Sequence, residues 1–467
     1  MSEQHTASAR HTDRSRVRIL VPTGMLGGGF PPETITRGIE LGADAIAVDA
    51  GSTDSGPFYL GTGQAKTAAA QVEHDLRVLL CAAVKASIPL LVGSCGTSGT
   101  DSGVDWIAGM ARRIAAEEHL AFTLARIYSE QSADDLVAAL TDDRIRPLAP
   151  ARPLTEATLK SCSHIVGLMG HEPISAALRS GADVVLAGRA TDTALVAAIA
   201  LDRGLPAGPT WHGAKTVECG GLCTTNPIAG GVLLEIDDTG FTVTPLDTSA
   251  ACTPRTIAAH MLYENANPFE LREPPGTLDT SDATYRALDS RVVRVEGSVF
   301  ESAETYTIKL EGSALVGYET ITVAGIRDPA VLSNIEAWTE FLTTLIADRV
   351  STALGVAGDT YDFDVSRYGY DAVLGALEPE HSSHEIGILF RVRAGDQATA
   401  TAIAKVANPL LLHLPLPGAQ SMPSFAFPFS PAEIERGPAY EFVLNHTVAP
   451  ATPTSMFRTE ITTIDHA

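Results

Sequence analysis

The sequence lacks any hydrophobic run of the length that crosses a membrane. No apolar stretch in the chain reaches the roughly 18 residues that span a bilayer. The first 16 residues, MSEQHTASARHTDRSR, lack the apolar core of a secretory signal, so we expect a disordered tail there. These absences predict a cytoplasmic protein without a membrane partner.

Cysteine is also scarce. The six cysteines do not have the spacing of a disulfide-rich scaffold, which favours reduced thiols in a cytosolic protein. Cys219 and Cys223 form a C-x₃-C pair, but this is not one of the strong zinc patterns and no second pair accompanies it. The sequence therefore predicts neither a disulfide nor a metal bound by these thiols.

Basic residues are outnumbered. The chain has 33 Lys and Arg against 56 Asp and Glu, a formal net charge of -23. Such a charge repels the phosphate backbone of nucleic acids and the surface of an anionic membrane alike. We therefore expect no nucleic-acid partner, whereas a small anion can still be held in a local basic pocket.

Short β-rich apolar runs alternate with stretches of helical period between Val17 and Leu205. This alternation is typical of a parallel sheet with helices on its faces. Two of the expected helices cover residues 66–87 and 105–118. The expected strands are 17–21, 45–48, 90–92, 122–128, 164–168 and 183–186.

The pattern changes after Pro206. A β-hairpin is expected at 231–236 and 241–243, joined by the Gly-containing loop 237–240. Further expected elements are strands at 292–295, 305–310, 318–323, 361–365 and 385–392, and helices at 330–354 and 397–412. We therefore predict an α/β fold: an N-terminal parallel sheet with flanking helices, Rossmann-like or doubly wound, followed by a β-rich α+β C-terminal region. The predicted domains are 17–210 (parallel α/β), 211–325 (β-rich) and 326–467 (α+β).

Polar side chains gather in the segments that follow the expected strands. Parallel strands share a direction, so their carboxyl ends meet at one edge of the sheet, where ligands bind in open α/β folds. Gly, Ser, Thr and Asp also serve as helix caps, but several such segments together favour a functional cleft. The candidate substrate-binding residues are Gly27, Gly28, Asp49, Asp54, Ser55, Asp101, Ser102, Arg189 and Thr191.

One tetrapeptide, Thr-Asp-Ser-Gly, occurs at two of these positions, residues 53–56 and 100–103. Each copy follows an expected strand and precedes a helix. Two readings stay open: Asp54 and Asp101 face one pocket, or each only bonds its own backbone.

The first glycine-rich loop, residues 24–29, follows the first expected strand. Its glycines do not have the G-x-G-x-x-G spacing of dinucleotide-binding loops. A Walker lysine follows none of the Gly-rich loops. A nicotinamide cofactor and nucleotide hydrolysis are therefore both disfavoured.

Glu218 and Cys219 lie in a Gly-rich turn just before the hairpin. A carboxylate in such a turn, next to a sheet edge, is partly desolvated, which raises its pKa and suits it to acid–base catalysis. Glu218 is therefore a candidate catalytic residue.

Several segments together resemble one known family. These segments are 182–195, which contains Gly188-Arg-Ala-Thr-Asp192, then Glu218-Cys-Gly220, Ala258-Ala-His-Met-Leu-Tyr-Glu264 and Pro274-Pro275. In them the chain resembles the AtuA-like acyclic terpene utilisation family, over most of residues 17–325. The resemblance implies a role in the catabolism of acyclic terpenes such as citronellol and geraniol through coenzyme A thioesters. Residues 23–30 differ from the Gly-Ala-Gly-Phe-Ser-Gly-Asp type of loop typical of the family, so we expect altered substrate loops on a shared scaffold.

The candidate residues favour proton transfer. Arg189 would bind a substrate carboxylate through two hydrogen bonds, and an acid or His171 would move the proton. We therefore predict a lyase, hydratase or isomerase that acts on a small branched carboxylic acid or its coenzyme A thioester. The candidate catalytic residues are His171, Asp192, Glu218 and Cys219.

Two alternatives stay open. A divalent-metal-dependent hydrolase or lyase would use oxygen-rich ligands for Mg²⁺, drawn from Asp49, Asp54, Asp101, His171, Glu172 and Asp192. The chain would otherwise be a non-catalytic subunit of a catabolic complex. The cofactor is open between none and Mg²⁺, and a homo-oligomer is one outcome for the assembly.

Overall fold

The computed structural model describes residues 15–465, except 152, 380–382, 420, 421 and 424. The expected disordered tail lies outside the described residues, apart from Ser15 and Arg16. The chain divides into two compact units. Unit 1 is Met1–Ala314 with Phe442–Ala467, and unit 2 is Leu315–Glu441.

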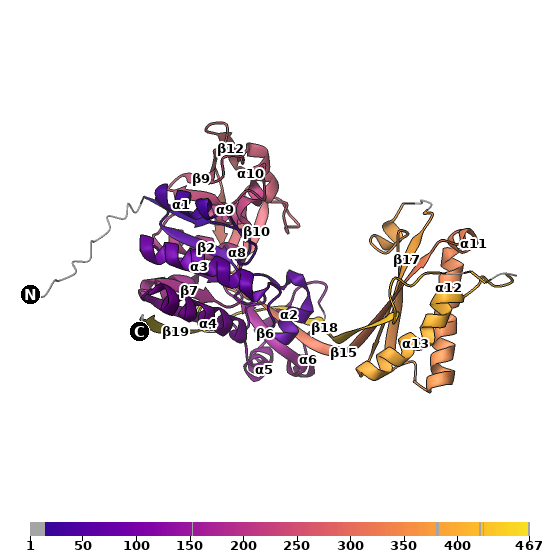
Figure 1. Ribbon diagram of the computed structural model, residues 1–467. Coiled ribbons are helices and arrows are strands. Elements are labelled where there is room, and N and C mark those ends of the chain that lie inside the picture. Colours follow the sequence, from indigo (N-terminus) through magenta and orange to yellow (C-terminus); the bar gives the residue numbers. More distant parts are fainter. Residues whose placement is uncertain (1–14, 152, 380–382, 420–421, 424, 466–467) are drawn as a thin grey trace, which may run out of the picture. The chain divides into compact units, whose positions relative to one another are not determined.

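Unit 1 is built, within the described residues, on a ten-stranded sheet of order β12-β13-β9-β8-β1-β2-β3-β7-β4-β19 (Figure 1). The centre, from β1 to β4, is parallel, and the flanking strands β8 and β19 pair antiparallel with it. The predicted parallel sheet is therefore confirmed. The strands are β1 Arg16–Val21, β2 Ala45–Asp49, β3 Leu90–Gly93, β4 Phe122–Tyr128, β7 Val184–Ala187, β8 Val232–Asp237, β9 Gly240–Pro245, β12 Thr284–Ala287, β13 Val293–Glu296 and β19 Arg458–Ile464.

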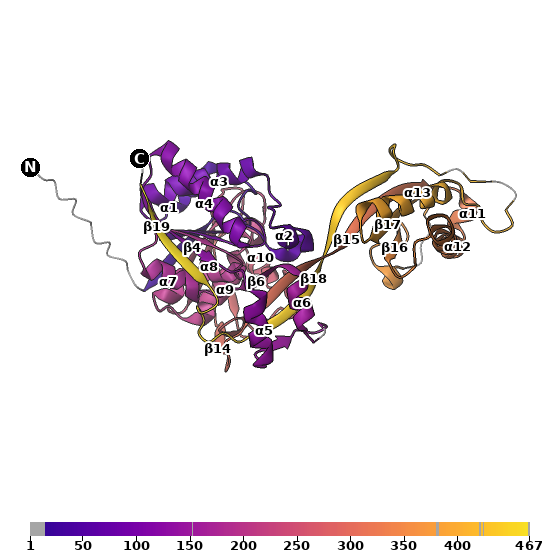
Figure 2. The same ribbon diagram turned by 90° about the horizontal axis from the view of Figure 1, so that it is seen from below.

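Helices cover both faces of this sheet (Figure 2). Successive side chains of a strand point to opposite faces, so Ile46 and Val48 pack with α1, α3 and α4, whereas Ala45 and Ala47 pack with α7, α8 and α9. The predicted doubly wound arrangement follows from this alternation. The helices of unit 1 are α1 Pro32–Glu40, α2 Pro57–Thr62, α3 Ala69–Ala86, α4 Asp101–Glu118, α5 Ala133–Thr141, α6 Glu156–Ser161, α7 Glu172–Arg179, α8 Asp192–Asp202, α9 Ala207–Val217 and α10 Pro254–His260, with short 3₁₀ turns η1 Thr53–Ser55 and η2 Gly220–Cys223.

One strand expected in the parallel sheet belongs elsewhere. β6 (Cys162–Leu168) pairs antiparallel with β15 (Ile308–Ile326). The prediction was wrong because a strand pattern does not reveal which strand will be its partner. Met169, just after β6, still forms a parallel bridge with Ala190, so the end of β6 reaches the sheet edge after β7.

β15 corrects a second expectation. Residues 305–310 and 318–323 were expected to form two strands, but β15 is continuous. Its first part pairs with β6 and its second part with β17 (Ile386–Ala394). The segment Glu311-Gly-Ser313 has the composition of a turn, yet it stays extended because β6 pairs with each of its residues.

Unit 2 is an α+β unit. Its sheet contains β16 (Tyr361–Tyr368), β17 and parts of β15 and β18 (Glu433–Val448). Helices α12 (Ile335–Arg349) and α13 (Gln397–His413) pack on this sheet around the buried Trp338. The helix expected at 330–354 is interrupted at Asn334: α11 spans Pro329–Leu332, and α12 continues into a π-helical turn, Val350–Leu354.

Several short elements and the C-terminal strands gave no clear sequence signal. β19 pairs with β4 along its whole length, and the end of β18 pairs with β5. The remaining short elements are β5 Ile145–Pro147, β10 Glu270–Glu273, β11 Gly276–Asp279, β14 Val299–Ser302 and η4 Gly375–Leu377. None of the helices that the structure describes combines the length and the hydropathy of a membrane span.

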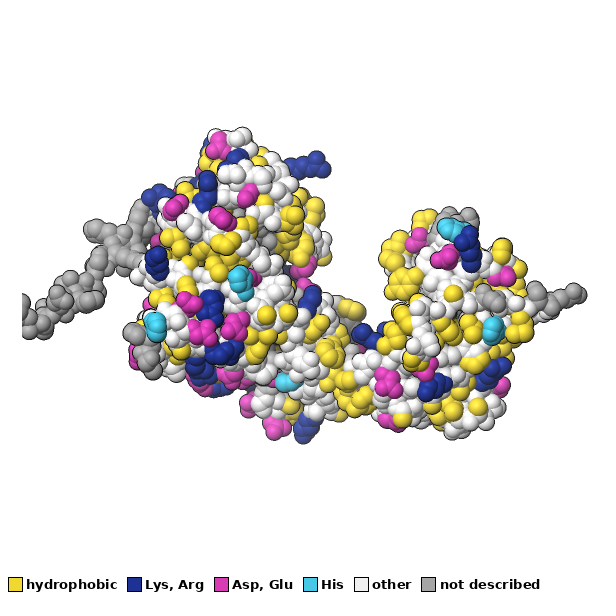
Figure 3. Space-filling view, viewed as in Figure 1, with side chains coloured by type: hydrophobic (Ala, Val, Ile, Leu, Met, Phe, Trp, Pro, Cys, Tyr) yellow, Lys and Arg dark blue, Asp and Glu magenta, His cyan; other side chains and the backbone are white. Residues whose placement is uncertain are grey.

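The outer face of α3 and α4 carries charges of both signs (Figure 3). Arg77 pairs with Glu117 and Glu118, and Arg113 pairs with Glu73. Exposed pairs of this kind contribute little stability. They do make this face a mixed-charge surface, although the chain as a whole is acidic.

Candidate functional site

Three helices begin at the sheet edge where the parallel strands end. Ser52, Thr100 and Thr191 cap η1, α4 and α8, each by accepting a hydrogen bond from a backbone N–H two or three residues further on. In the first Thr-Asp-Ser-Gly copy, the capping residue is Ser52, which precedes the tetrapeptide. In the second copy, it is Thr100, the threonine of the tetrapeptide itself. Asp54 and Asp101 consequently occupy different places in their helices.

Glycines allow the loops at this edge to approach one another. A Cβ atom on Gly99 would lie 2.1 Å from the backbone nitrogen of Arg189, and one on Gly24 would lie 3.1 Å from the Cα of Cys219. Gly220 has a φ of +58°, and its Cβ would lie 2.9 Å from Thr23. These contacts hold the loop after β3 against Arg189 and the loop after β1 against the turn that bears Glu218 and Cys219.

Arg189 is buried and forms an ion pair with Glu311 of β15. Its Nε donates to Glu311 Oε2 at 3.1 Å, and its Nη1 donates to Ser94 Oγ at 3.3 Å and to the Ala190 carbonyl at 3.2 Å. The side chains of Arg189 and Glu311 are only 8% and 6% exposed. The guanidinium is therefore fixed in place, and its Nη2 is the nitrogen without a partner among the described residues.

Glu311 stays ionised although it is buried. Thr53 Oγ1 and Lys309 Nζ also donate to its carboxylate, at 3.0 and 2.9 Å. Burial raises the pKa of Glu311, but Arg189 and Lys309 outweigh burial and hold the pKa at about 2. Burial in turn lowers the pKa of Arg189, but Glu311 and Asp192 raise it above its ordinary value.

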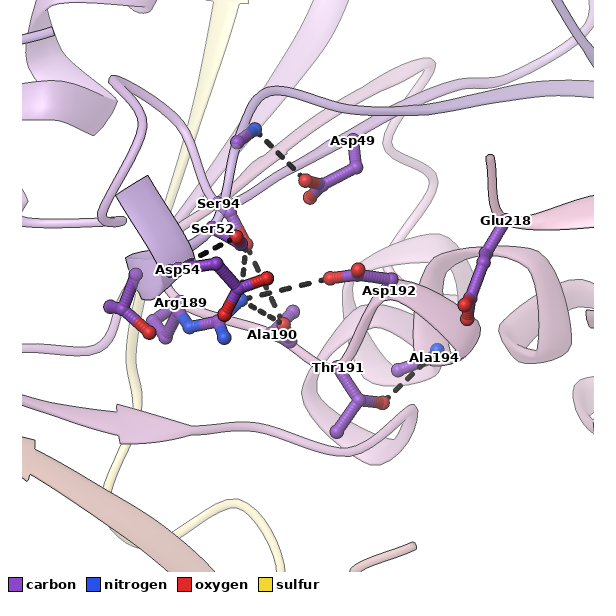
Figure 4. A network of polar contacts seen from close by, with 12 residues as sticks. Asp49, Ser52, Asp54, Ser94, Arg189, Ala190, Thr191, Asp192, Ala194 and Glu218 are labelled. Carbon is purple, nitrogen blue, oxygen red and sulfur yellow. Dashed lines mark hydrogen bonds and ion pairs between the residues drawn. The ribbon is translucent and has the colours of Figure 1, made fainter. Parts of the chain in front are cut away.

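Asp192, the first residue of α8, lies between Arg189 and Glu218 in Figure 4. Its Oδ1 is 3.7 Å from Nη1 of Arg189. Burial raises the pKa of Asp192, an effect that Arg189 and Lys215 only partly offset. Its charge in turn acts on all of the following groups: Asp49, Arg189, Lys215, Glu218, Cys219 and Glu273. Together with Asp192 these residues are called the Asp192 cluster below.

Two buried carboxyl groups of the cluster each keep one oxygen without a partner in the described part of the chain. Asp49 accepts from the N–H of Gly51 through Oδ2 at 2.8 Å, and its Oδ1 is unpaired. Glu273 accepts from Thr193 through Oε1 at 2.5 Å, and its Oε2 is unpaired. Burial, reinforced by Asp192, raises the pKa of Asp49 well above its ordinary value, and burial raises the pKa of Glu273 to about 7. Glu273 is therefore protonated in part at neutral pH, and the pKa of Asp49 is shifted in the same direction.

Lys215 and Glu218 form a second buried ion pair, at the end of α9. Lys215 Nζ donates to Glu218 Oε1 at 2.5 Å, and the two side chains are 6% and 4% exposed. Burial raises the pKa of Glu218 to about 8 in spite of Lys215. Burial lowers the pKa of Lys215, but Glu218 outweighs burial and raises it.

His260, the last residue of α10, adjoins this pair. It is buried, its Nε2 has no partner among the described residues, and burial lowers its pKa to about 4, so the ring is neutral at pH 7. The ring stacks on Tyr263 at 5.5 Å between centroids. One oxygen of Glu218, Cys219 Sγ and a ring nitrogen of His260 lie within 4.8 Å of one another. Burial, with the charges of Glu218 and Asp192, raises the pKa of the Cys219 thiol.

Asp54 and Asp101 do not share a pocket. Asp54 is exposed and lies beside Arg189 in Figure 4, and its charge acts on Asp192. Asp101 instead exchanges hydrogen bonds with Glu130 and forms an ion pair with Arg458 at 3.3 Å. The repeated tetrapeptide therefore places one carboxylate near the Asp192 cluster and the other in a separate group.

His171 and Glu172 form a further group on the Glu273 side of the cluster. His171 Nδ1 is 3.2 Å from Ser175 Oγ, and Glu172 accepts from the Tyr306 hydroxyl at 2.7 Å. The charge of Glu273 acts on Tyr306, which links the two groups. The residues considered as Mg²⁺ ligands are thus spread over separate groups.

The other sequence candidates have local partners. Ser55 accepts from Lys66 Nζ at 3.1 Å, Ser102 and Thr100 share a hydrogen bond at 3.0 Å, and Thr191 caps α8. The backbone N–H of Gly28 donates to the Met25 carbonyl at 2.9 Å.

The amides of Gly27 and Gly29 donate to Oδ2 of the buried Asp75, at 2.9 and 3.0 Å. In a dinucleotide-binding loop, such amides would face a phosphate. In this chain, the carboxylate of Asp75 on α3 accepts their hydrogen bonds instead.

Four residues of the site were missed in the sequence. Lys215 had a usable signal, since a cation three residues before Glu218 on a helix predicts an ion pair. His260 lay in the segment that carried the family resemblance, and Glu273 preceded Pro274-Pro275. Glu311 gave no local signal, because only the pairing of β15 with β6 brings it to Arg189.

Comparison with known families agrees with this site. The model of a family described as acyclic terpene utilisation family protein AtuA matches residues 63–203 and 215–434. The chain belongs to this family. The resemblance noted in the sequence is thereby confirmed, and the match extends through most of unit 2. Searches of curated proteins and of solved structures gave no match.

AtuA membership associates the chain with acyclic terpene utilisation. Asp49 is the member of the Asp192 cluster that lies outside the matched regions, and Asp54 and residues 23–29 lie outside them as well. The other members of the cluster lie inside them.

Proposed function

We propose that this AtuA-family chain is a proton-transfer enzyme, an isomerase or a hydratase-type lyase. The substrate is a small branched carboxylic acid, or its coenzyme A thioester, from acyclic terpene breakdown. One observation carries the proposal: Asp49 and Glu273 are buried beside Asp192, burial raises the pKa of both carboxyl groups, and each has one oxygen without a partner among the described residues.

The chemistry of such a pair suits a substrate with an acidic C–H next to a carbonyl. Removal of that proton develops negative charge on the carbonyl oxygen, which a neutral carboxylic acid stabilises by donating a hydrogen bond. A second carboxyl group with a pKa near the working pH takes the proton and returns it. In this proposal Glu273 is the base, because its pKa of about 7 populates both states, and Asp49 is the neutral donor.

Arg189 and Asp192 hold this arrangement. Glu311, Ser94 and Ala190 engage Nε and Nη1 of Arg189, so its Nη2 is left for one hydrogen bond to a substrate oxygen. Asp192 contributes the negative charge that helps to keep Asp49 and Glu273 protonated. Arg189 therefore binds, and Asp192 sets the proton affinity of its neighbours.

The test is proton exchange into solvent. A panel of methyl-branched acids and their coenzyme A thioesters is incubated with the full-length protein in D₂O, and loss of C–H signals is followed by NMR. Glu273→Gln should slow exchange on the accepted substrate by about 10²-fold or more, the range of a lost general base. Glu270→Gln, the same change at an exposed position of β10, should exchange at the wild-type rate. Exchange with none of the panel, or an undiminished rate in Glu273→Gln, would contradict the proposal.

A further inference from the structure

A second constellation lies beside the proton-transfer residues. Glu218 and Cys219 follow α9 directly, and His260 ends α10. A carboxylate oxygen, a thiol sulfur and an imidazole nitrogen of these residues lie within 4.8 Å of one another. Among the described residues, no other set of three or more His, Cys, Asp or Glu side chains gathers its ligand atoms in this way.

We propose that Glu218, Cys219 and His260 bind a Zn²⁺ ion. This inference goes beyond the proposed reaction and does not depend on it. Thiolate and imidazole ligands favour Zn²⁺ over Mg²⁺, which prefers oxygen ligands alone. A set of three protein ligands is the catalytic pattern of zinc, which leaves the fourth position for water or substrate.

The distances suit a tetrahedral ion. Zinc-ligand bonds of about 2.0–2.3 Å place neighbouring ligand atoms roughly 3.5 Å apart. The ligand atoms lie within 4.8 Å of one another, so the side chains need to close in by at most about 1.3 Å, which rotation about side-chain bonds supplies. Cys219 itself is positioned by the close approach of Gly24 to its backbone.

The unpaired ring nitrogen of His260 is the second observation that points to a ligand. His260 is 5% exposed, and its Nε2 lacks a partner among the described residues. A buried polar atom without a hydrogen bond costs about 1–3 kcal/mol. A metal ion on the ring, or the water that it carries, removes such a cost.

The surrounding charges favour a cation. Glu218 gives one oxygen to Lys215, so its other oxygen is left for the metal. Lys215 opposes a cation, but the carboxylates of Asp192 and Glu264 act on the same thiol and offset it. On binding, Cys219 loses its thiol proton and Glu218 loses any carboxyl proton, both to solvent, as the Zn–S and Zn–O bonds form.

The experiment is metal titration of the full-length protein after treatment with a chelator. One equivalent of Co²⁺ should give the near-ultraviolet absorption of a thiolate–Co²⁺ bond with the visible bands of a tetrahedral ion, and Zn²⁺ should abolish both. Cys219→Ser should lose the thiolate absorption, and His260→Gln should bind Zn²⁺ at least tenfold more weakly. Cys81→Ser and His74→Gln, which make the same changes on α3, should behave as wild type.

Two results would overturn the proposal: no thiolate absorption in folded wild-type protein, or full absorption and Zn²⁺ affinity in both ligand variants. If a variant does not fold, the rate of alkylation of Cys219 in the wild-type protein, mapped by mass spectrometry, is measured in place of the titration of that variant. Zn²⁺ should slow this alkylation, and an unchanged rate overturns the site. Because none of these readouts uses turnover, failure of the metal site is distinguishable from failure of the proposed reaction.

Discussion

The buried carboxyl groups of Glu311 and Glu273 differ in whether a cation lies beside them. Glu311 has both Arg189 and Lys309, so its carboxylate is ionised with a pKa of about 2. Glu273 lacks such a direct partner, so burial holds its pKa at about 7. Desolvation is common to both, and the two cations beside Glu311 outweigh it, whereas the single cation Lys215 does not outweigh it at Glu218, whose pKa is about 8. This difference in pKa is why Glu311 is suited to hold Arg189 and Glu273 is suited to transfer a proton.

Glu311 should therefore contribute stability that depends on pH. Its pKa falls from 4.5 when unfolded to about 2 when folded, so the stabilisation is fully present above pH 4.5 and is lost as pH falls towards 2. At neutral pH, Glu311→Gln should lower the free energy of unfolding by about 3–5 kcal/mol, because Arg189 is left buried without its partner. Urea denaturation at a series of pH values measures the effect.

The matched control for this change is Glu301→Gln, at an exposed position of β14. Its free energy of unfolding should stay within about 0.5 kcal/mol of wild type. A Glu311→Gln variant with wild-type stability at neutral pH, or with a deficit that does not shrink in acid, would show that the ion pair is not stabilising.

At the scale of the elements, glycines bring the loops of the site into contact. Gly99 has a φ of +69° and lies against the backbone of Arg189, while Gly204 has a φ of +83° and open space around its Cβ position. The two glycines thus share a left-handed backbone conformation, but only Gly99 is crowded. They form a natural pair for separating the two effects.

Gly99→Ala should destabilise the protein and weaken the site, whereas Gly204→Ala should cost only about 1–2 kcal/mol for the left-handed backbone. The methyl group that Gly99→Ala introduces would lie 2.1 Å from the Arg189 nitrogen, so the loop must move, at about 1–3 kcal/mol more. Thermal unfolding and the proton-exchange assay measure both consequences. Equal effects of the two substitutions would mean that close packing at Gly99 does not hold the site.

The elements that were predicted correctly are those with a clear local hydrophobic pattern. β1, β2, β3, β4 and β7 were predicted because each is a short apolar run followed by a helix. The partner of β6 and the strands β18 and β19 were not predicted, because strand pairing depends on residues far away in the chain. The same limit applies to the site: Asp49, Arg189, Asp192, Glu218 and Cys219 come together, while Asp101 and His171 belong to other groups.

At the scale of the whole molecule, the family match covers parts of both units, whereas the Asp192 cluster lies in unit 1. Unit 2 has its own core, in which Trp338 is fully buried and donates its Nε1–H to the Leu414 carbonyl at 3.0 Å. Trp338→Ala should therefore destabilise unit 2 by about 3–5 kcal/mol.

Hydrogen exchange followed by mass spectrometry checks this prediction. Peptides from α12, α13 and β17 should lose protection in Trp338→Ala, while peptides from β1, β2 and β3 serve as the internal control. A loss of protection spread evenly over both units would contradict the division into separate cores.

The central claim is that a buried carboxyl group at the Asp192 cluster carries a proton at neutral pH. Infrared difference spectroscopy of wild-type against Glu273→Gln protein, after chelator treatment and over a range of pH, tests it most directly. The account predicts a protonated-carboxyl band that is absent from the variant and that disappears as pH rises through about 7. A band lost near pH 4.5, the ordinary pKa of a glutamic acid, or a wild-type-minus-variant difference spectrum without such a band, would contradict the account.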